Sequence, residues 1–148
     1  MKTAEQIDLW LKNEPGKLSE VSGLLGANGV NILAFYVATE GGEGKLHFIA
    51  DDPDRAMKIL KTAGYRAESK EVIACEMPAH PGGLNAVLKP LKLANINLDY
   101  IYPCIGTGHE TVLILGLERV NDAIKILEDN WIRILGDELY PLYMASEP

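Results

Sequence analysis

The sequence lacks the motifs that mark the common classes of hydrolase, metalloprotease and nucleotide-binding enzyme. It has no G-x-S-x-G nucleophile elbow, no H-E-x-x-H zinc motif and no Walker lysine. Cysteine is scarce. The chain has two, Cys75 and Cys104, which are far apart in the sequence and have neither C-x-x-C spacing nor a neighbouring pair of histidines. We therefore expect two small buried hydrophobic residues, and neither a metal site nor a cofactor.

Basic clusters and long apolar runs are also missing from the 148 residues. The chain has 14 lysines and arginines against 21 acidic residues, a net charge of −7, whereas a nucleic-acid-binding surface needs a basic face. The longest apolar run, residues 112–117, is as long as a strand and far short of the roughly 18 residues that span a membrane. No signal peptide is recognisable after Met1. These absences predict a cytoplasmic protein that binds neither nucleic acid nor membrane.

What the chain does contain is a duplication of most of its length. Pro15-Gly16 followed by Leu18 returns as Pro81-Gly82 followed by Leu84, and residues 29–32 return as residues 95–98 at the same offset. Further on, one inserted residue lengthens the offset: Ala56, Lys58, Ile59 and Leu60 match Ala123, Lys125, Ile126 and Leu127. Because each copy is about half of the chain, the repeat predicts two similar domains, residues 1–70 and 71–148, rather than a solenoid.

In the first copy, hydrophobic spacing predicts a β-α-β-β-α-β order. Residues 6–12 alternate apolar and polar side chains, which is typical of a half-buried strand, and helical spacing follows from Leu18 to Asn28. The remaining elements are strands over 31–39 and 45–50 joined by a glycine-rich hairpin loop, a helix entered at 51–54, and a strand near 66–72. Gly29, and Asn95 in the second copy, are expected to turn left-handed at a helix end.

The second copy predicts the same order, so the fold class is α+β. We expect two ferredoxin-like domains in tandem, their antiparallel sheets side by side and their helices on one face. Pro90 is expected to kink or shorten the first helix of this copy. The outermost strands would remain unpaired, which favours a homodimer. The predicted elements are strands over 73–77, 98–102, 111–117 and 132–139, helices over 82–94 and 121–130, and an extra strand over 140–144.

The turn between the first strand and the first helix of each copy is the best candidate site. Backbone N–H groups at a helix start attract anions, and the amides of Asn31 and Asn97 can hold both an ammonium and a carboxylate. Turn formation alone also explains each of these residues, although the duplicated set favours a site. The predicted ligand-binding residues are Asn13, Pro15, Gly16, Lys17, Leu18, Asn31 and Ile32, and His80, Pro81, Gly82, Gly83, Leu84, Asn97 and Leu98.

The motif Asn13-Glu14-Pro15-Gly16-Lys17-Leu18, followed by Gly29-Val30-Asn31-Ile32, resembles the ACT domain. The resemblance covers essentially residues 1–148 as two ACT domains in tandem, although Ala79 replaces the first Asn in the second copy and Asn95 replaces the Gly. It implies an amino acid held between domains, with the Pro-Gly turn of one domain facing the Asn of another. Asn13 would then face Asn97, and His80 would face Asn31.

The resemblance implies a regulatory protein and not an enzyme, one that binds a free amino acid or a similar small ligand and acts allosterically on itself or on a partner enzyme. Which amino acid binds stays open at this point, as does pairing of the domains within or between chains. A second interpretation is a regulatory subunit that docks on an amino-acid biosynthetic enzyme such as acetolactate synthase. A third, a ferredoxin-like enzyme such as an acylphosphatase, would need an arginine in the first turn, and residues 13–18 and 79–84 have none.

Overall fold

The computed structural model of the chain describes residues 2–105, 111–136 and 139. It consists of two compact units, which are described separately. The N-terminal unit is Glu5–Lys70, and the C-terminal unit is Glu71–Pro148 together with Met1–Ala4. The strand predicted over residues 140–144 lies outside the described part of the chain.

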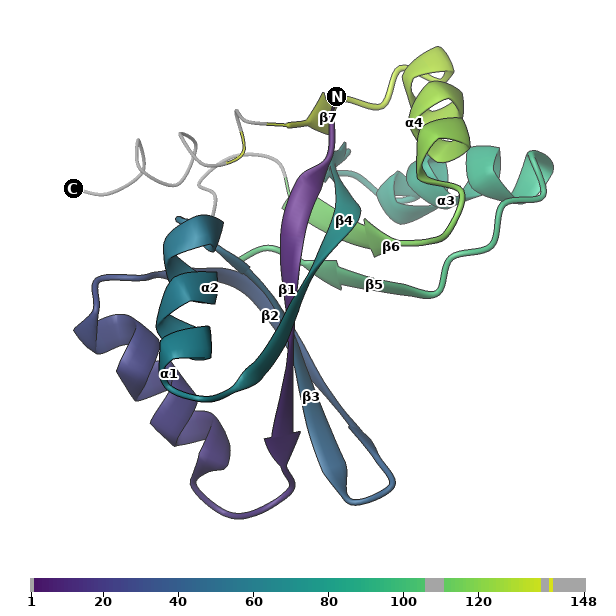
Figure 1. The fold of residues 1–148 in the computed structure, drawn as a ribbon. Helices are drawn as coiled ribbons and strands as arrows, with labels where there is room; N and C mark the ends of the chain where they lie inside the picture. The colour runs from purple at the N-terminus through teal and green to yellow at the C-terminus, as the bar shows by residue number, and fades with distance from the viewer. Residues whose placement is uncertain (1, 106–110, 137–138, 140–148) are drawn as a thin grey trace. The chain divides into compact units, whose positions relative to one another are not determined.

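The N-terminal unit is a sheet covered by two helices on one face (Figure 1). Strand order is β2-β3-β1-β4, and β3 pairs antiparallel with both β1 and β2. The elements are β1 (Ala4–Lys12), α1 (Lys17–Ala27), β2 (Ile32–Glu40), β3 (Glu43–Ala50), α2 (Pro53–Thr62) and the beginning of β4 (Arg66–Met77).

The core of this unit follows directly from the alternation in β1. Ile7 and Leu9 lie opposite Phe48 and Leu46 of β3, and all four point towards the helices. The helices bury Val21 and Leu25 of α1 and Ala56 and Leu60 of α2 against them. The register therefore places Gln6, Asp8 and Trp10 on the opposite face of the sheet.

The C-terminal unit repeats this plan with shorter strands. Its order is β7-β4-β6-β5, with β4 antiparallel to both β6 and β7. The last strand is much shorter than residues 132–139. Pro90 lies inside a helix of 11 residues, the same length as α1, so it does not shorten the helix relative to its counterpart, and the expected kink stays a prediction. The elements after β4 are α3 (Gly83–Leu93), β5 (Tyr100–Pro103), β6 (Thr111–Gly116), α4 (Val120–Asp129) and β7 (Ile134–Leu135).

Both units thus have the β-α-β-β-α-β order that the sequence predicts, which confirms the α+β, ferredoxin-like class. The predicted hairpin is confirmed as well, with a tighter loop. Glu40 pairs with Glu43, so Gly41 and Gly42 alone form the turn. Their φ angles are 57° and 85°, and two positive values are what a two-residue type I′ turn requires.

Helices α1, α2, α3 and α4 end in the same way. The residue after each C-cap is left-handed: Gly29 (φ 75°), Gly64 (86°), Asn95 (56°) and Trp131 (63°). In each case the next N–H bonds back to the helix, as Val30 does to the Leu25 carbonyl (2.9 Å) and Ile132 does to the Leu127 carbonyl (3.0 Å). This is the hydrogen-bond pattern of the Schellman motif. The left-handed conformations expected at Gly29 and Asn95 are confirmed.

Gly64 and Gly23 allow the free-energy cost of the left-handed conformation at a helix end to be measured. A Cβ at Gly64 would meet no atom within 4 Å, so Gly64→Ala changes only the backbone preference. We expect it to lower the free energy of unfolding by about 1–2 kcal/mol. Gly23, in the middle of α1, has equally open surroundings, and Gly23→Ala should raise that free energy by roughly 0.5–1 kcal/mol. Urea unfolding of both variants checks the opposite signs, and equal effects would contradict the left-handed requirement.

Candidate functional site

The predicted turn of the N-terminal unit lies on the surface between β1 and α1. Gly16 is the N-cap of α1 and is left-handed, with φ 84°. Its carbonyl accepts the N–H of Glu20 at 2.9 Å, whereas no side chain caps the helix. Asn13, Pro15, Gly16 and Leu18 are exposed, and Lys17 is half-buried. The turn therefore presents the free N–H end of α1 to solvent, as an anion site needs.

The matching turn of the C-terminal unit has the same backbone. Gly82 is the left-handed N-cap of α3, with φ 85°, and it also lacks a side-chain cap. His80 Nδ1 lies 2.8 Å from the Pro81 carbonyl, which accepts its hydrogen and fixes the ring against the turn. Gly83 is buried, and a Cβ there would lie 1.9 Å from the Pro78 carbonyl oxygen. Close packing alone thus explains the glycine at position 83, while His80, Pro81, Gly82 and Leu84 are exposed.

The two predicted asparagines of the following strands are exposed, while the apolar residue after each turns inward. The Asn31 N–H donates to Asp51 Oδ1 at 3.0 Å, and the Asn31 carbonyl accepts the Asp51 N–H at 3.0 Å. Asn97 lines a small pocket of about 170 Å³ with Asp99, Glu118 and Arg119. Ile32 and Leu98 pack against the cores of their own units.

Within each unit, the turn and the asparagine lie at opposite ends of the sheet. The Asn13 N–H bonds to Gly42 beside the hairpin, whereas Asn31 is bonded to Asp51 at the other end of β3. Since β3 has 8 residues, these ends are roughly 20 Å apart. In the C-terminal unit Met77, before the turn, pairs with Thr111 at one end of β6, and Asp99 bonds to Gly116 at the other. A single unit therefore does not bring its turn and its asparagine together.

Exposed apolar side chains recur at matching positions of the two units. Leu18 and Leu84 follow the two turns at the starts of α1 and α3. Phe35 of β2 and Ile101 of β5 lie on the edge strands of the two sheets. Exposed apolar side chains beside an edge strand are typical of a surface that pairs with another chain or domain.

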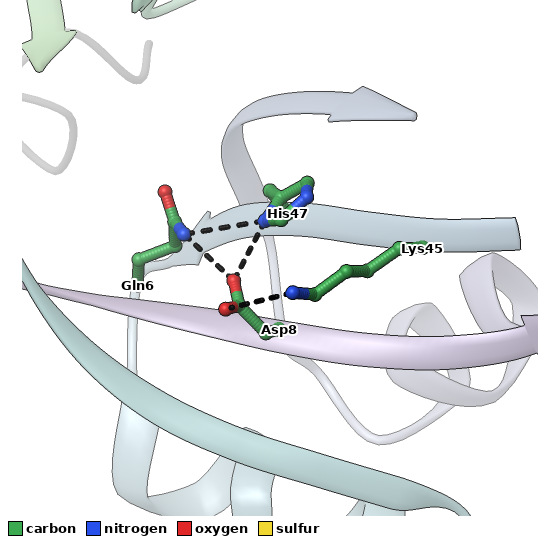
Figure 2. Close-up of polar contacts among 4 residues, drawn as sticks. All are labelled: Gln6, Asp8, Lys45 and His47. Carbon is green, nitrogen blue, oxygen red and sulfur yellow. Dashed lines mark hydrogen bonds and ion pairs between the residues drawn. The ribbon is translucent and has the colours of Figure 1, made fainter. Parts of the chain in front are cut away.

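Sequence analysis missed a buried polar cluster on the helix-free face of the N-terminal sheet. It consists of Gln6 and Asp8 of β1 with Lys45 and His47 of β3 (Figure 2). Asp8 Oδ1 lies 2.7 Å from Gln6 Nε2 and 2.7 Å from His47 Nδ1, and Asp8 Oδ2 lies 3.7 Å from Lys45 Nζ. Tyr36 of β2 stacks on the His47 ring, with centroids 4.3 Å apart.

The cluster holds a carboxylate in its ionised form. Burial alone would raise the pKa of Asp8, but hydrogen bonds from His47 and Gln6 and the charges of His47 and Lys45 outweigh it and lower that pKa below its ordinary value. A carboxylate only accepts, so His47 must donate through Nδ1–H. At the matching positions of the C-terminal unit the register places Ala74 and Ile114 where the N-terminal unit has Asp8 and His47, so the cluster is not repeated there.

Metal or thiol chemistry has no support in the described residues. No group of three His, Cys, Asp or Glu side chains in that part of the chain can hold a metal ion. Cys75 and Cys104 are both buried, as expected, and burial raises the pKa of the Cys75 thiol to about 12. None of the described helices combines the length and the apolar character needed to cross a membrane.

Two β-α-β-β-α-β units, each with a Pro-Gly turn at a helix start, define a class of tandem ferredoxin-like proteins. A family model described as "ACT domain pair" matches residues 2–141, and the chain belongs to this family. No match was found among curated proteins.

Solved structures agree with this assignment. The chain resembles a protein of Bacteroides thetaiotaomicron at 26% identity and a TM-score of 0.86, covering 94% of this chain and 96% of that one. The ligand-free regulatory subunit of aspartate kinase from Thermus thermophilus has 14% identity and a TM-score of 0.60, with coverage of 88% and 93%. The corresponding subunit from Thermus flavus has 15% identity and a TM-score of 0.57, with coverage of 88% and 94%. At these identities the two kinase subunits show a common fold.

Acid titration tests the polar cluster. Because folding lowers the pKa of Asp8, its stabilisation is complete above the ordinary value of 3.8 and is lost as the pH falls through the lower folded value. Asp8→Asn should therefore lower the free energy of unfolding at pH 7 by about 1–3 kcal/mol. The difference from the unmodified protein should shrink at acid pH. Glu68→Gln, at an exposed position of β4, is the control and should change little. A difference that stays constant down to pH 2 in urea unfolding would contradict the assignment.

Proposed function

We propose that this ACT domain pair is a regulatory protein that binds a free amino acid, or a similar small ligand, at interfaces between ACT domains. Binding changes the conformation or the assembly of the protein or of a partner enzyme, and the chain itself catalyses no reaction. The observation that carries the proposal is the placement of each turn and each asparagine at opposite ends of one sheet. Two domains are needed to combine them, which suits a ligand site at an interface.

The chemistry of the two halves supports an amino acid as ligand. The exposed helix start after Gly16 or Gly82 offers backbone N–H groups to a carboxylate. An asparagine from the other domain offers an amide oxygen to the ammonium and an amide nitrogen to the carboxylate. We propose that Asn13 faces Asn97 at one site and that His80 faces Asn31 at the other. The domains in this proposal are residues 1–70 and 71–148.

Assembly belongs to the same proposal. β2 and β5 are edge strands, and their exposed apolar side chains Phe35 and Ile101 accompany Leu18 and Leu84 beside the turns. Pairing along these edges would produce a homodimer and would bring a turn of one domain to the asparagine of another. We propose a cytoplasmic homodimer.

A second candidate is a regulatory subunit that docks on an amino-acid biosynthetic enzyme. The fold shared with the regulatory subunit of aspartate kinase from Thermus thermophilus favours it, and acetolactate synthase is another enzyme of this kind. Affinity purification of the tagged chain from its own cells tests this candidate. Recovery of a biosynthetic enzyme in a fixed ratio would support it, and recovery of the chain alone would not.

A thermal-shift screen against each of the twenty amino acids tests the binding function. A ligand that binds only the folded protein stabilises it by about 2.7 kcal/mol at 100 times its dissociation constant. We expect one or a few amino acids to raise the melting temperature by several degrees. The matching D-amino acid is the control for each hit. No shift by any amino acid at millimolar concentration would contradict the proposal.

The two sites should be unequal, because their polar residues differ. Asn13 and Asn97 are two amides, whereas the other site pairs Asn31 with a turn in which Ala79 has replaced the amide. A hydrogen bond to a charged ligand contributes about 1.5–3 kcal/mol. In titration calorimetry, Asn13→Ala or Asn97→Ala should weaken the tighter site roughly ten- to a hundredfold, and Asn31→Ala should change it much less. Equal losses from Asn13→Ala and Asn31→Ala would contradict the asymmetry.

A further inference from the structure

Trp131 is an unusual residue at the end of α4. It is left-handed, with φ 63°, a conformation that a bulky L-residue adopts only at a cost. The matching position of the N-terminal unit is Gly64, which adopts the same conformation without that cost. Burial does not compensate, since Trp131 is 95% exposed. Its indole N–H also has no hydrogen-bond partner among the described residues. Neither the backbone nor the packing of the C-terminal unit explains a tryptophan here.

Two acidic residues shortly precede this tryptophan in the chain. Glu128 and Asp129 close α4, and both are exposed. Glu128 forms an ion pair with Lys2 at 3.3 Å, whereas Asp129 has no ion pair among the described residues. We call Glu128, Asp129 and Trp131 the α4 tip. At the matching positions the N-terminal unit has Lys61, Thr62 and Gly64, so only the C-terminal unit has an acidic, aromatic tip.

A groove with the opposite character runs along the outer side of α1 and α2 in the N-terminal unit. It has a volume of about 410 Å³ and combines apolar Leu24, Ile59 and Ala63 with the cations of Arg55 and Lys58. Neither cation forms an ion pair within the described part of the chain. In the C-terminal unit Asp122 stands at the position of Arg55, and Lys125 at that of Lys58, so this pair of positions carries no net charge there. The two copies have thus diverged into complementary surfaces, one of each per chain.

We propose that the α4 tip of one chain docks into the α1/α2 groove of a second copy of the same chain. The indole lies against the apolar side chains with the cations beside its ring, an arrangement that cation–π attraction favours. Asp129 lies next to Lys58 or Arg55. Tryptophan in a desolvated pocket is a frequent hot spot of protein interfaces. This contact uses the helix layer, so it is independent of the sheet edges and of the amino-acid sites.

Tryptophan fluorescence gives a direct readout. The chain has two tryptophans, so in a Trp10→Phe variant Trp131 alone reports. Its emission should be that of an exposed indole when dilute and should shift to shorter wavelength as the protein concentration rises. Lys58→Glu should move the shift to a several-fold higher protein concentration, and Lys125→Glu, the matched position in the C-terminal unit, should not. Emission that is independent of concentration, whether exposed or shielded, would overturn docking between copies.

Sedimentation velocity measures the same association step. Trp131→Gly should weaken it about 30-fold or more, the loss typical of a hot-spot residue. The same variant should leave the melting temperature unchanged or raise it by a few degrees, because glycine relieves the left-handed strain. Trp131→Ala should weaken association equally without that gain. An association constant unchanged by both substitutions would overturn the proposal.

A charge swap completes the test. Asp129→Lys and Lys58→Glu should each weaken association several-fold, and the double variant should recover most of the loss because the pair is restored with reversed signs. Additive losses in the double variant would overturn the pairing. Amino-acid binding is measured on the same variants and should be unchanged. Absence of amino-acid binding in the unmodified protein, with association intact, would count against the proposed function alone, so the two proposals fail separately.

Discussion

Burial of one sheet face beneath two short helices is the constraint on which each unit depends. Each helix has 10 or 11 residues, a length at which an isolated helix is marginal in water. The helices are therefore stable only where Val21, Leu25, Ala56 and Leu60, or their counterparts in the C-terminal unit, are packed on the strands. Packing at this spacing requires the chain to reverse sharply at each helix end. The four left-handed residues provide that reversal, which is why the same hydrogen bonds recur at all four.

Comparison of the two copies shows which positions are determined by burial of the sheet face beneath the helices and which positions can vary. On the helix-facing side both units keep aliphatic residues at matching positions. On the opposite face the same positions carry different chemistry. Arg66 lies over the Trp10 ring at 4.1 Å, whereas its counterpart Arg133 pairs with Glu76 at 2.9 Å. In both cases a side chain of β4 contacts a side chain of the neighbouring segment. The fold therefore requires a contact at these positions but not a particular type of interaction.

Features set by local physics could be predicted from the sequence. Period-two and helical spacing located the strands and helices, and the repeat identified Asn95 as the equivalent of a left-handed glycine. The predicted site residues lie where the spacing puts them, in turns and at strand starts, because these positions depend on a few neighbouring residues. The short β7 was not anticipated, since its pairing with β4 rests on long-range contacts.

The Asp8 cluster and Trp131 could not be predicted for a related reason. Alternation in β1 correctly puts Gln6 and Asp8 on the helix-free face, and polar residues on such a face usually meet water. The partners of Asp8, His47 and Lys45, are distant in the sequence, and local periodicity gives no information about such contacts. The left-handed position after a helix is usually occupied by glycine or asparagine. A tryptophan at position 131 therefore argues against the conformation that this residue adopts. A position where local preference and structure disagree is a candidate for function.

The separation of turn and asparagine also determines how a ligand would act. One half-site offers two or three hydrogen bonds to a charged ligand, worth about 1.5–3 kcal/mol each. The cost of immobilising the ligand, about 4 kcal/mol or more, offsets most of that gain. Two such bonds, worth at most about 6 kcal/mol before this cost, therefore leave a half-site short of the about 4.1 kcal/mol net that a response to millimolar amino acid needs. In the proposed function two domains supply the two halves. By linkage, the ligand would then strengthen the domain interface by the same factor by which the interface strengthens ligand binding. Sensing and assembly are in that case one equilibrium.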